Sequence, residues 1–464
     1  MDSLGTVMSS SSRTWNPPNS IPGKLKYVIL TVGPMAILMS ASMGPGTISS
    51  LTVAGSTLGF SALWLALFSG WLGAAVYYVG GKVCAITGET PVDLINRFTH
   101  PVFTYVLLSV LLYVWYYTIW SQGNILSTTT ALLVPPVAPY ADWLVTPLLI
   151  LVIAFIFVGG FDRVKAVLSA FTVFMAAVFL VNALYVGPDL GAVGSGLVPK
   201  LLDGSSGASA FAGILGGSVG IGPIWYAYIA HDNDWGRDQL KFMAADQIVF
   251  YGVLFTVFSV GIYLSAAATL QGVTVDGAVD AATSLEPVGG EFAALLFGLG
   301  LWAAAFTTIG GMSAVAAYLV TDLVNHLPFV DRDFELSMDS TVFKGVIVVG
   351  VVSSAVGPFL SDLPALPLMV YAISLFNVVA PTTILIFTIA VVRKRDVGEY
   401  RGPWYLVVGL LAAFGITLYS VYSLENDLYF QVAVVLVLGI LSYTAYREVT
   451  DTHLAIRGSW TRGD

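Results

Sequence analysis

Two stretches rich in glycine and proline interrupt hydrophobic segments that are each long enough to cross a lipid bilayer. The first is Gly-Pro-Gly at residues 44–46, and the second, residues 213–223, holds five glycines and ends in Pro223. Proline has no N–H to donate, and glycine costs about 1 kcal/mol in a helix interior relative to alanine, so both stretches predict unwound backbone. Free carbonyl groups at such breaks can coordinate a cation, and the adjoining helix N-termini favour anionic groups. We therefore expect the two breaks to form a binding site for an ion or a small solute.

The residues at the two breaks are the candidate binding residues, because irregular backbone at membrane depth is tolerated only where it is buried in protein or lines a wet cavity. One Gly-Pro pair could be a mere kink in a packing helix, but a second break at a matching position favours a substrate site. The expected lining residues are Gly44, Pro45, Gly46, Thr47, Gln122, Asn124, Gly217, Ser218, Gly220, Gly222, Ser374 and Asn377. If a metal binds there, Thr47 and the backbone of Gly44 and Gly217 are its expected ligands.

Other polar side chains in the hydrophobic segments have two possible roles. A hydroxyl in a membrane helix more often bonds within its own helix or to a neighbouring one than to a solute. The amides of Gln122 and Asn124 are costlier to bury, which favours a cavity for them. Trp225 and Tyr226, beside the second break, could close a solute cavity. Further candidates for the lining are Ser42, Ser49, Ser50, Thr307, Thr308, Ser313, Thr382 and Thr383.

Asp246 is the charged residue most informative about mechanism. An ionisable side chain inside a membrane span is a functional candidate by default. Asp246 lies about one helical turn into a predicted span that begins at residue 243, so it could carry a proton in coupling or gate an inner vestibule. Lys241 is close enough in sequence for a plain ion pair at the helix end, and that alternative stays open.

The composition identifies an integral membrane protein. Hydrophobic residues make up 57% of the 464 residues and charged residues 10%, whereas soluble domains carry about 25% charged residues. The single cysteine excludes internal disulfides and cysteine-based metal clusters. The net charge of −9 argues against nucleic acid as a partner. No phosphate-binding loop, catalytic triad or metal cluster is visible in the sequence, so neither enzymatic chemistry nor a cofactor is expected.

Twelve segments have the roughly 20 apolar residues that a bilayer crossing needs. They are 27–56, 61–84, 101–133, 143–160, 164–186, 208–230, 243–269, 291–322, 342–360, 365–392, 403–423 and 428–446. Residues 1–25 are polar and are expected to form a disordered cytoplasmic tail.

The basic residues predict the orientation and the organisation of the crossings. With the N-terminus in the cytoplasm, every Lys and Arg except Lys200 falls on the inner side, as the positive-inside rule requires. Both termini are then cytoplasmic, in a multi-pass protein whose partner is the lipid bilayer of the cell membrane. The broken segments begin two five-crossing units of opposite orientation, 26–190 and 191–395, followed by two crossings in 396–450 and a cytoplasmic tail, 451–464. This all-α arrangement is a LeuT-type inverted repeat.

Several short motifs resemble the natural resistance-associated macrophage protein (NRAMP) family of divalent-metal transporters. The Gly-Pro pair at 33–34, the turn at 44–46 and the stretch 54–60 resemble the family's first helix and its exit. The stretch 85–89 is similar to the end of its second helix, and residues 196–199 with 213–216 to its approach to helix 6. Asp246 stands where the family carries an acidic residue early in helix 7. The resemblance covers most of the first ten crossings and implies a secondary transporter of a divalent metal cation that works by alternating access.

The resemblance fails at the metal-binding side chains. Metal-transporting members carry Asp-Pro-Gly-Asn in the first helix, where this chain has Gly-Pro-Gly-Thr at 44–47. In helix 6 the family presents an alanine carbonyl, a methionine thioether and a Pro-His pair; the matching positions here are Gly217, Gly220, Ile221 and Gly222. The crossing at 101–133 has no charged residue and the one at 342–360 has only Lys344, so the family's charged proton route has no match.

These departures leave the substrate open. Mn²⁺ and Fe²⁺ favour anionic or nitrogen ligands, while Mg²⁺ can keep several of its waters and use carbonyl oxygens. The resemblance implies a divalent cation of the Mn, Fe or Mg class, whereas the uncharged breaks favour a small polar or zwitterionic organic solute, or a hydrated ion. A non-transporting membrane receptor or partner subunit is a third possibility. The coupling ion, a proton or sodium, is also left open.

Overall fold

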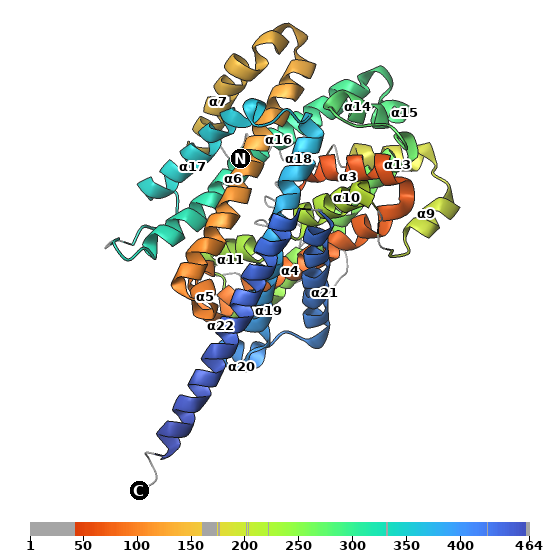
Figure 1. Ribbon diagram of the computed structural model, residues 1–464. Coiled ribbons are helices and arrows are strands. Elements are labelled where there is room, and N and C mark those ends of the chain that lie inside the picture. The colour runs from red at the N-terminus through yellow and green to blue at the C-terminus, as the bar shows by residue number, and fades with distance from the viewer. Residues whose placement is uncertain are drawn as a thin grey trace, which may run out of the picture.

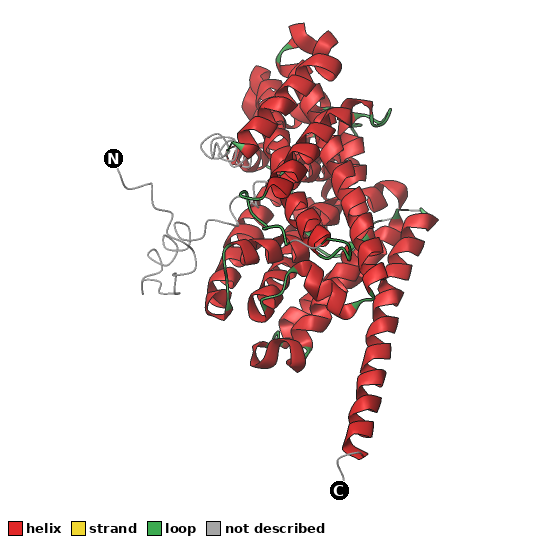
Figure 2. Ribbon diagram, turned by 90° about the vertical axis from the view of Figure 1, so that its left-hand side faces the viewer, coloured by secondary structure: helices red, strands yellow, loops and turns green. Residues whose placement is uncertain are grey.

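The computed structural model describes residues 42–159, 174, 177–200, 202, 204–220, 222–330, 333–424 and 426–460. Every regular element in these ranges is helical, which agrees with the predicted all-α class (Figures 1 and 2). The predicted tail 1–25, the first part of the first crossing and most of the fifth lie outside the described residues, as do the last four residues of the chain.

Long helices form the body of the protein, and short ones connect them. The long helices are α3 (Pro45–Leu58), α4 (Leu63–Thr87), α6 (Pro101–Leu133), α7 (Thr146–Val158), α10 (Gly204–Ser218), α11 (Gly222–Asp232), α13 (Thr256–Thr269), α16 (Ala293–Asn325), α17 (Thr341–Ser353), α18 (Ala365–Ser374), α19 (Ala380–Val392), α21 (Trp404–Ser423) and α22 (Asp427–Trp460). The short helices are α5 (Pro91–Phe98), α9 (Leu190–Gly196), α12 (Leu240–Asp246), α14 (Ala278–Ala282), α15 (Glu286–Gly289) and α20 (Lys394–Val397).

The described residues contain 10 helical stretches that are long and apolar enough to cross a membrane. One of them, Pro45–Thr87, holds the described part of the first predicted crossing and all of the second. The described end of the fifth crossing is the shorter apolar helix Ala177–Val186. Each of the twelve predicted crossings therefore has an apolar helix in the described chain, and the protein is a multi-pass membrane protein.

Both predicted breaks are confirmed. Ser42 is helical, a turn follows at residues 43–44, and α3 then begins at Pro45 with Gly44 in an extended conformation before it. Proline suits this first position because its missing N–H would have no partner in the helix. In the second half, α10 ends at Ser218 and α11 begins at Gly222. The second broken crossing thus consists of two half-helices, α10 and α11, and the first break is followed directly by the half-helix α3.

Glycines let the broken helices approach their neighbours at backbone distance. A Cβ added to Gly80 of α4 would lie 1.9 Å from the carbonyl oxygen of Pro223, at the start of α11. A Cβ on Gly216 of α10 would lie 2.0 Å from the carbonyl oxygen of Ile373 in α18. Side chains would therefore push α4, α11 and α18 away from the second break, and these glycines serve close packing.

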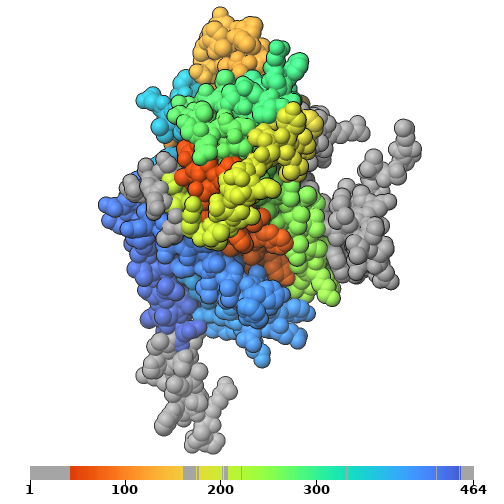
Figure 3. Space-filling model, turned by 90° about the vertical axis from the view of Figure 1, so that its right-hand side faces the viewer, coloured from red at the N-terminus to blue at the C-terminus, as the bar shows by residue number. Residues whose placement is uncertain are grey.

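The first break lies in the interior of the bundle. Helix α3 packs against α10, α13 and α18, and residues 45–52 are all buried. In the space-filling view of Figure 3, the red and orange surface of α3 and α4 shows only between later helices. Helices α21 and α22 lie at one side of the bundle, and α22 continues beyond it to Trp460 as a long helix (Figures 1 and 2).

Two irregular segments have no counterpart in the predictions. A π-helical segment, Gln247–Phe255, joins α12 to α13 within the seventh crossing. A 3₁₀ segment, Leu375–Val378, separates α18 from α19 within the tenth. Neither segment contains the glycine and proline pattern that marks the two breaks. Helix propensity therefore does not predict these two irregular segments.

Candidate functional site

A small cavity lies where the two breaks meet. About 40 Å³ of it is open to the centres of water molecules, which is room for about three waters at 10–15 Å³ each. A space of this size suits a single ion with a few waters better than a large organic solute. Its lining comes from α3, α4, α6, α10, α11, α16, α18 and the 3₁₀ segment: Ser42, Gly44, Gly46, Thr47, Tyr77, Thr118, Gln122, Gly216, Gly217, Trp225, Thr308, Met312, Ile373 and Phe376.

Thr47 ties the two sides of the first break together. Its hydroxyl donates a hydrogen bond of 2.6 Å to the backbone carbonyl of Ser42, the last helical residue before the break. This carbonyl has lost its usual partner in the helix, so the threonine acts as a side-chain cap. A Cβ added to Gly217 would lie 2.7 Å from the Thr47 hydroxyl, which shows how closely the two breaks approach. The Gly217 carbonyl in turn accepts a 3.3 Å bond from Tyr251.

Three buried polar atoms on the cavity wall have no hydrogen-bond partner within the described residues. They are the Gln122 amide oxygen, the Thr308 hydroxyl and the Trp225 indole N–H. Buried polar groups are nearly always paired, because an unpaired one costs about 1–3 kcal/mol. Two oxygens and one N–H donor on one small wall therefore mark a place built for a polar or hydrated occupant.

Aromatic rings close the cavity on one side. Trp225 and Phe376 line it, and both pack edge-on against Trp115, at centroid distances of 5.6 Å and 5.9 Å. The Trp115 indole N–H donates a 2.9 Å bond to the Met312 carbonyl, which fixes this ring between α6 and α16. The role suggested for Trp225 by its position beside the break agrees with this arrangement. Tyr226, by contrast, points to a different partner and does not line the cavity.

The structure brings five of the predicted site residues to the cavity and places seven elsewhere. Gly44, Gly46, Thr47, Gln122 and Gly217 line it. The others, which do not line it, are Pro45, Asn124, Ser218, Gly220, Gly222, Ser374 and Asn377.

Three of these seven have other hydrogen-bonding partners. The hydroxyls of Ser218 and Ser374 donate to backbone carbonyls of their own helices, at 2.9 Å and 2.6 Å. The Asn377 amide donates at 2.7 Å to the Ala212 carbonyl and so links the tenth crossing to α10. Their side chains therefore have structural partners in this conformation.

Several lining residues were absent from the predictions, and some carried a signal. Thr118 lies four residues before Gln122 on α6, and Met312 four residues after Thr308 on α16, so each shares a helix face with a polar candidate. Tyr77 gives no such signal, because it lies in the middle of an uninterrupted crossing. Gly216 belongs to the predicted second break. Ile373 and Phe376 adjoin the predicted Ser374 and Asn377.

Known proteins resemble this chain in sequence. Residues 35–425 match the family profile described as Natural resistance-associated macrophage protein-like. The chain belongs to this family. The divalent metal cation transporter MntH of Deinococcus radiodurans is 25% identical over 310 residues, which cover 62% of this chain and 67% of that protein. MntH of Yersinia pestis strain Pestoides F is 26% identical over 304 residues, which cover 61% of this chain and 70% of that one.

Solved structures resemble this NRAMP family member in fold. The manganese transporter of Eremococcus coleocola, in complex with an aromatic bis-isothiourea substituted compound, matches with a TM-score of 0.67 at 15% identity and covers 96% of this chain and 98% of that one. Mhp1, a nucleobase-cation-symport-1 family transporter, matches with a TM-score of 0.54 at 18% identity over 90% and 92% of the two chains. At these identities the likeness concerns the fold, and it confirms the predicted LeuT-type fold.

This family member keeps a buried carboxylate outside the cavity, at Asp246. Its side chain is fully buried, and one oxygen accepts a 2.6 Å hydrogen bond from the Tyr226 hydroxyl of α11. The other oxygen has no partner among the described residues. Lys241 is exposed and forms no ion pair with Asp246 in the described chain, so the helix-end ion pair is wrong. The intervening residues place the two side chains in different environments, one in solvent and one between helices.

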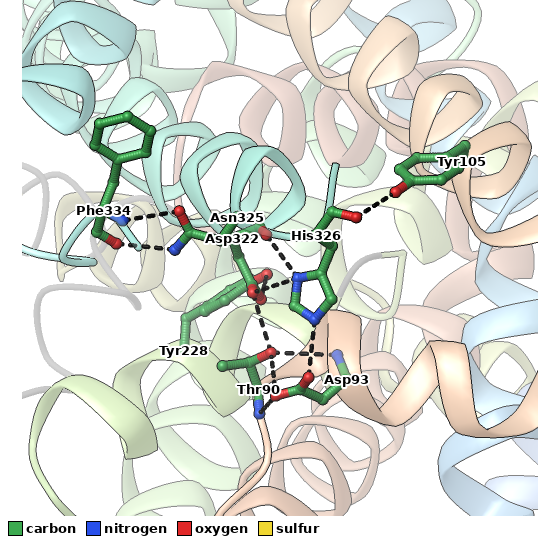
Figure 4. A network of polar contacts seen from close by, with 8 residues as sticks. All are labelled: Thr90, Asp93, Tyr105, Tyr228, Asp322, Asn325, His326 and Phe334. Carbon is green, nitrogen blue, oxygen red and sulfur yellow. Dashed lines mark hydrogen bonds and ion pairs between the residues drawn. The ribbon is translucent and has the colours of Figure 1, made fainter. Parts of the chain in front are cut away.

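A second polar cluster joins α5, α11 and α16 (Figure 4). Asp322 of α16 accepts hydrogen bonds from the hydroxyls of Tyr228, at 2.8 Å, and Thr90, at 3.1 Å. His326 directs one ring nitrogen to the Asp322 backbone carbonyl and the other to Asp93, each at 2.8 Å. Thr90 and Asp93 also form a capping box that begins α5. Three elements far apart in the sequence are thus held by one network.

The His326–Asp93 pair predicts a pH-dependent contribution to stability. The hydrogen bond between the two side chains raises the pKa of His326 from 6.5 to about 9. The same bond lowers the pKa of Asp93 from 3.8 to about 2. The histidine contribution is therefore complete below pH 6.5 and is lost as the pH rises through about 9. The aspartate contribution is present above pH 3.8 and is lost as the pH falls through about 2.

We expect His326→Gln to remove the part of the wild-type loss of thermal stability that occurs between pH 6.5 and about 9. The measurement is the unfolding midpoint of purified protein in detergent across that range. His100→Gln is the matched control, since His100 accepts a hydrogen bond from the backbone N–H of Val102 at the start of α6 and packs edge-on against Tyr443, away from the Asp93 cluster. Identical pH profiles for wild type and His326→Gln would contradict the assignment.

Proposed function

We propose that the protein is a secondary transporter that carries a divalent metal cation through the cavity between the two breaks. Membership of the NRAMP family supports this function, as do relatives named divalent metal cation transporter and a fold shared with a manganese transporter. The observation that carries the proposal is the cavity itself, which lies at the meeting point of two broken helices and presents unpaired oxygens. Alternating access exposes this cavity to each side of the membrane in turn. The protein moves its substrate without converting it and is not an enzyme.

The ligand set favours a cation that retains part of its water shell. The polar side chains on the wall are neutral: Ser42, Thr47, Thr118, Gln122 and Thr308 supply oxygens, and none of the described residues brings a carboxylate to the cavity. A bare dication in such a site lacks a counter-charge, which makes dehydration costly. Mg²⁺ dehydrates reluctantly and binds through hard oxygens, whereas Mn²⁺ and Fe²⁺ gain more from anionic or nitrogen ligands. Within the Mn, Fe and Mg class, the site therefore favours Mg²⁺.

We assign to Asp246 the coupling of metal transport to the movement of a second ion. A buried carboxylate that receives one hydroxyl and no cation from the described residues can take up and release a proton. A proton therefore fits better than sodium, which needs several oxygen ligands.

Both termini face the cytoplasm of the cell, since the basic residues then lie on the inner side.

The test is uptake of Mg²⁺ and Mn²⁺ into proteoliposomes that contain the purified full-length protein. We expect saturable metal uptake by the wild type, and uptake reduced at least about tenfold in Thr47→Val. Valine keeps the shape of the threonine side chain but removes its hydroxyl at the first break. Ser218→Ala is the control, because its hydroxyl bonds within its own helix and lies outside the cavity. No uptake of either ion by correctly folded protein, together with saturable uptake of an amino acid or amine, would replace the metal with an organic solute.

A further inference from the structure

Helix α11, the half-helix that follows the second break, is held on two sides by tyrosine hydroxyls. Tyr226 donates to Asp246 at 2.6 Å, and Tyr228 donates to Asp322 at 2.8 Å. Residues two apart on a helix point to nearly opposite faces, so the two bonds fix α11 between α12 and α16. All four side chains are buried, with at most 2% of their surface exposed. A tyrosine hydroxyl bonded to a buried carboxylate is among the stronger hydrogen bonds.

The Tyr228 side of this clamp extends into the larger cluster of Figure 4. Asp322 also receives the hydroxyl of Thr90, and His326 connects the end of α16 to Asp93 of α5. Tyr105 of α6 donates at 2.7 Å to the His326 carbonyl, so a fourth helix is attached. The cluster thus fastens α11 to the connection between the second and third crossings, which lies on the cytoplasmic side in the predicted topology.

The position of Tyr228 relates this cluster to the cavity. Trp225, on the cavity wall, precedes Tyr228 by three residues of the same helix, and the two side chains share one face of α11. A movement of α11 that withdraws Trp225 from the cavity also pulls Tyr228 from Asp322. The cavity cannot open along this face while the cluster stays intact.

We propose that Thr90, Asp93, Tyr228, Asp322 and His326 form a cytoplasmic latch, which holds α11 closed and must part before the cavity opens to the cytoplasm. The proposal rests on the alternating-access function proposed above. These five side chains are positioning residues, because none of them lines the cavity. Parting the latch breaks the hydrogen bonds that Asp322 accepts from Tyr228 and Thr90, together with the His326–Asp93 pair, and the loss of these bonds opposes spontaneous opening.

The chain carries its own reporter for this movement. Cys84, its only cysteine, is buried in the last turn of α4. Cys84 lies six residues before Thr90, and the chain leaves α4 at Gly88, whose N–H donates to the Cys84 carbonyl, to enter the latch. When the latch parts, water and small reagents from the cytoplasmic side gain access to this thiol.

The experiment measures the rate at which a membrane-impermeant maleimide modifies Cys84 of full-length protein in inside-out vesicles. We expect labelling at least about tenfold faster than in the wild type both in Tyr228→Phe, which loses the buried hydrogen bond, and in Asp322→Asn, which keeps an acceptor oxygen but loses the charge that strengthens the bond. Tyr263→Phe is the matched control, because Tyr263 is also a buried tyrosine, with its hydroxyl bonded at 2.6 Å to the Gly59 carbonyl away from the latch. Its rate should stay at the wild-type value.

A double variant separates a latch from general loosening. If Tyr228 and Asp322 act through one bond, Tyr228→Phe with Asp322→Asn labels no faster than the faster single variant. Rates that multiply, or an unchanged rate in folded single variants, would overturn the proposal. If Tyr228→Phe fails to insert, Thr90→Val removes the α5 side of the same cluster and is expected to accelerate labelling likewise. Labelling needs no substrate, so a failure of the latch is distinguishable from a failure of metal transport.

Discussion

Replacing Gln122 with leucine is expected to stabilise the protein while removing most of its transport. The Gln122 amide oxygen is buried on the cavity wall and has no hydrogen-bond partner in the described chain. Leucine has nearly the same size, so the substitution removes an unpaired polar group worth about 1–3 kcal/mol. It also removes an oxygen ligand, and we expect at least an about tenfold loss of saturable metal uptake. The measurements are the thermal unfolding midpoint in detergent and uptake into proteoliposomes.

Ser121→Ala is the matched control for this result. Ser121 is the preceding residue of α6, is equally buried and bonds at 2.9 Å to the Tyr117 carbonyl of its own helix. It does not line the cavity, so uptake should stay close to the wild-type level. If Gln122→Leu leaves uptake unchanged, the amide has no role in substrate binding. If it lowers stability instead, the amide oxygen has a structural partner.

Gly80→Ala is expected to destabilise the protein strongly. The added Cβ would lie 1.9 Å from the Pro223 carbonyl oxygen, and its next contacts are also backbone atoms of Pro223. Backbone cannot turn aside as a side chain can, so α4 and α11 must separate. Overpacking of this kind typically costs about 1–3 kcal/mol and occasionally more. The expected readout is a lower thermal unfolding midpoint, together with reduced uptake because α11 borders the cavity.

Gly415→Ala tests the same chemical change where space is free. Gly415 lies in α21 and an added Cβ would meet nothing within 4 Å. Alanine is about 1 kcal/mol more favourable than glycine in a helix interior, so this variant should be neutral or slightly stabilised. Equal effects of the two substitutions would mean that Gly80 does not mediate close packing of α11.

The main architecture follows from local properties of the sequence. The Gly-Pro-Gly turn at 44–46 and the glycine-rich stretch 213–223 both lower the local helix propensity, and a break lies within each of them, although Gly213, Gly216 and Gly217 are helical residues of α10. Crossing limits also follow from hydropathy: the third crossing, predicted as 101–133, is α6, Pro101–Leu133. The proposed division into two repeats, 26–190 and 191–395, stays a prediction that fits the position of the breaks.

The composition of the site is harder to predict because it depends on helix rotation. Gln122 faces the cavity while Asn124, two residues on, does not, since such neighbours point to different faces of α6. When a helix is apolar on every side, its hydropathy does not show which of its faces points to the cavity. Tyr77 looks like an ordinary core residue in sequence and reaches the cavity only through the packing of α4.

The ion pair considered between Asp246 and Lys241 is another case in which helix packing, rather than the local sequence, decides the contact. Sequence proximity suggested Lys241, but the carboxylate faces inward to Tyr226 while the lysine is exposed. The cluster around Asp322 likewise assembles residues from α5, α11 and α16 that no local pattern connects. Contacts between distant segments were therefore beyond the reach of a single sequence.

The most direct test of the central claim, that the cavity between the two breaks binds a divalent cation, is calorimetric titration of the purified protein with Mg²⁺, Mn²⁺ and Ca²⁺. The structure predicts saturable binding of about one ion per chain, strongest for Mg²⁺, and at least about tenfold weaker in Thr47→Val but unchanged in Ser218→Ala. No binding of any of these ions to folded wild-type protein, or equal binding to Thr47→Val, would contradict it.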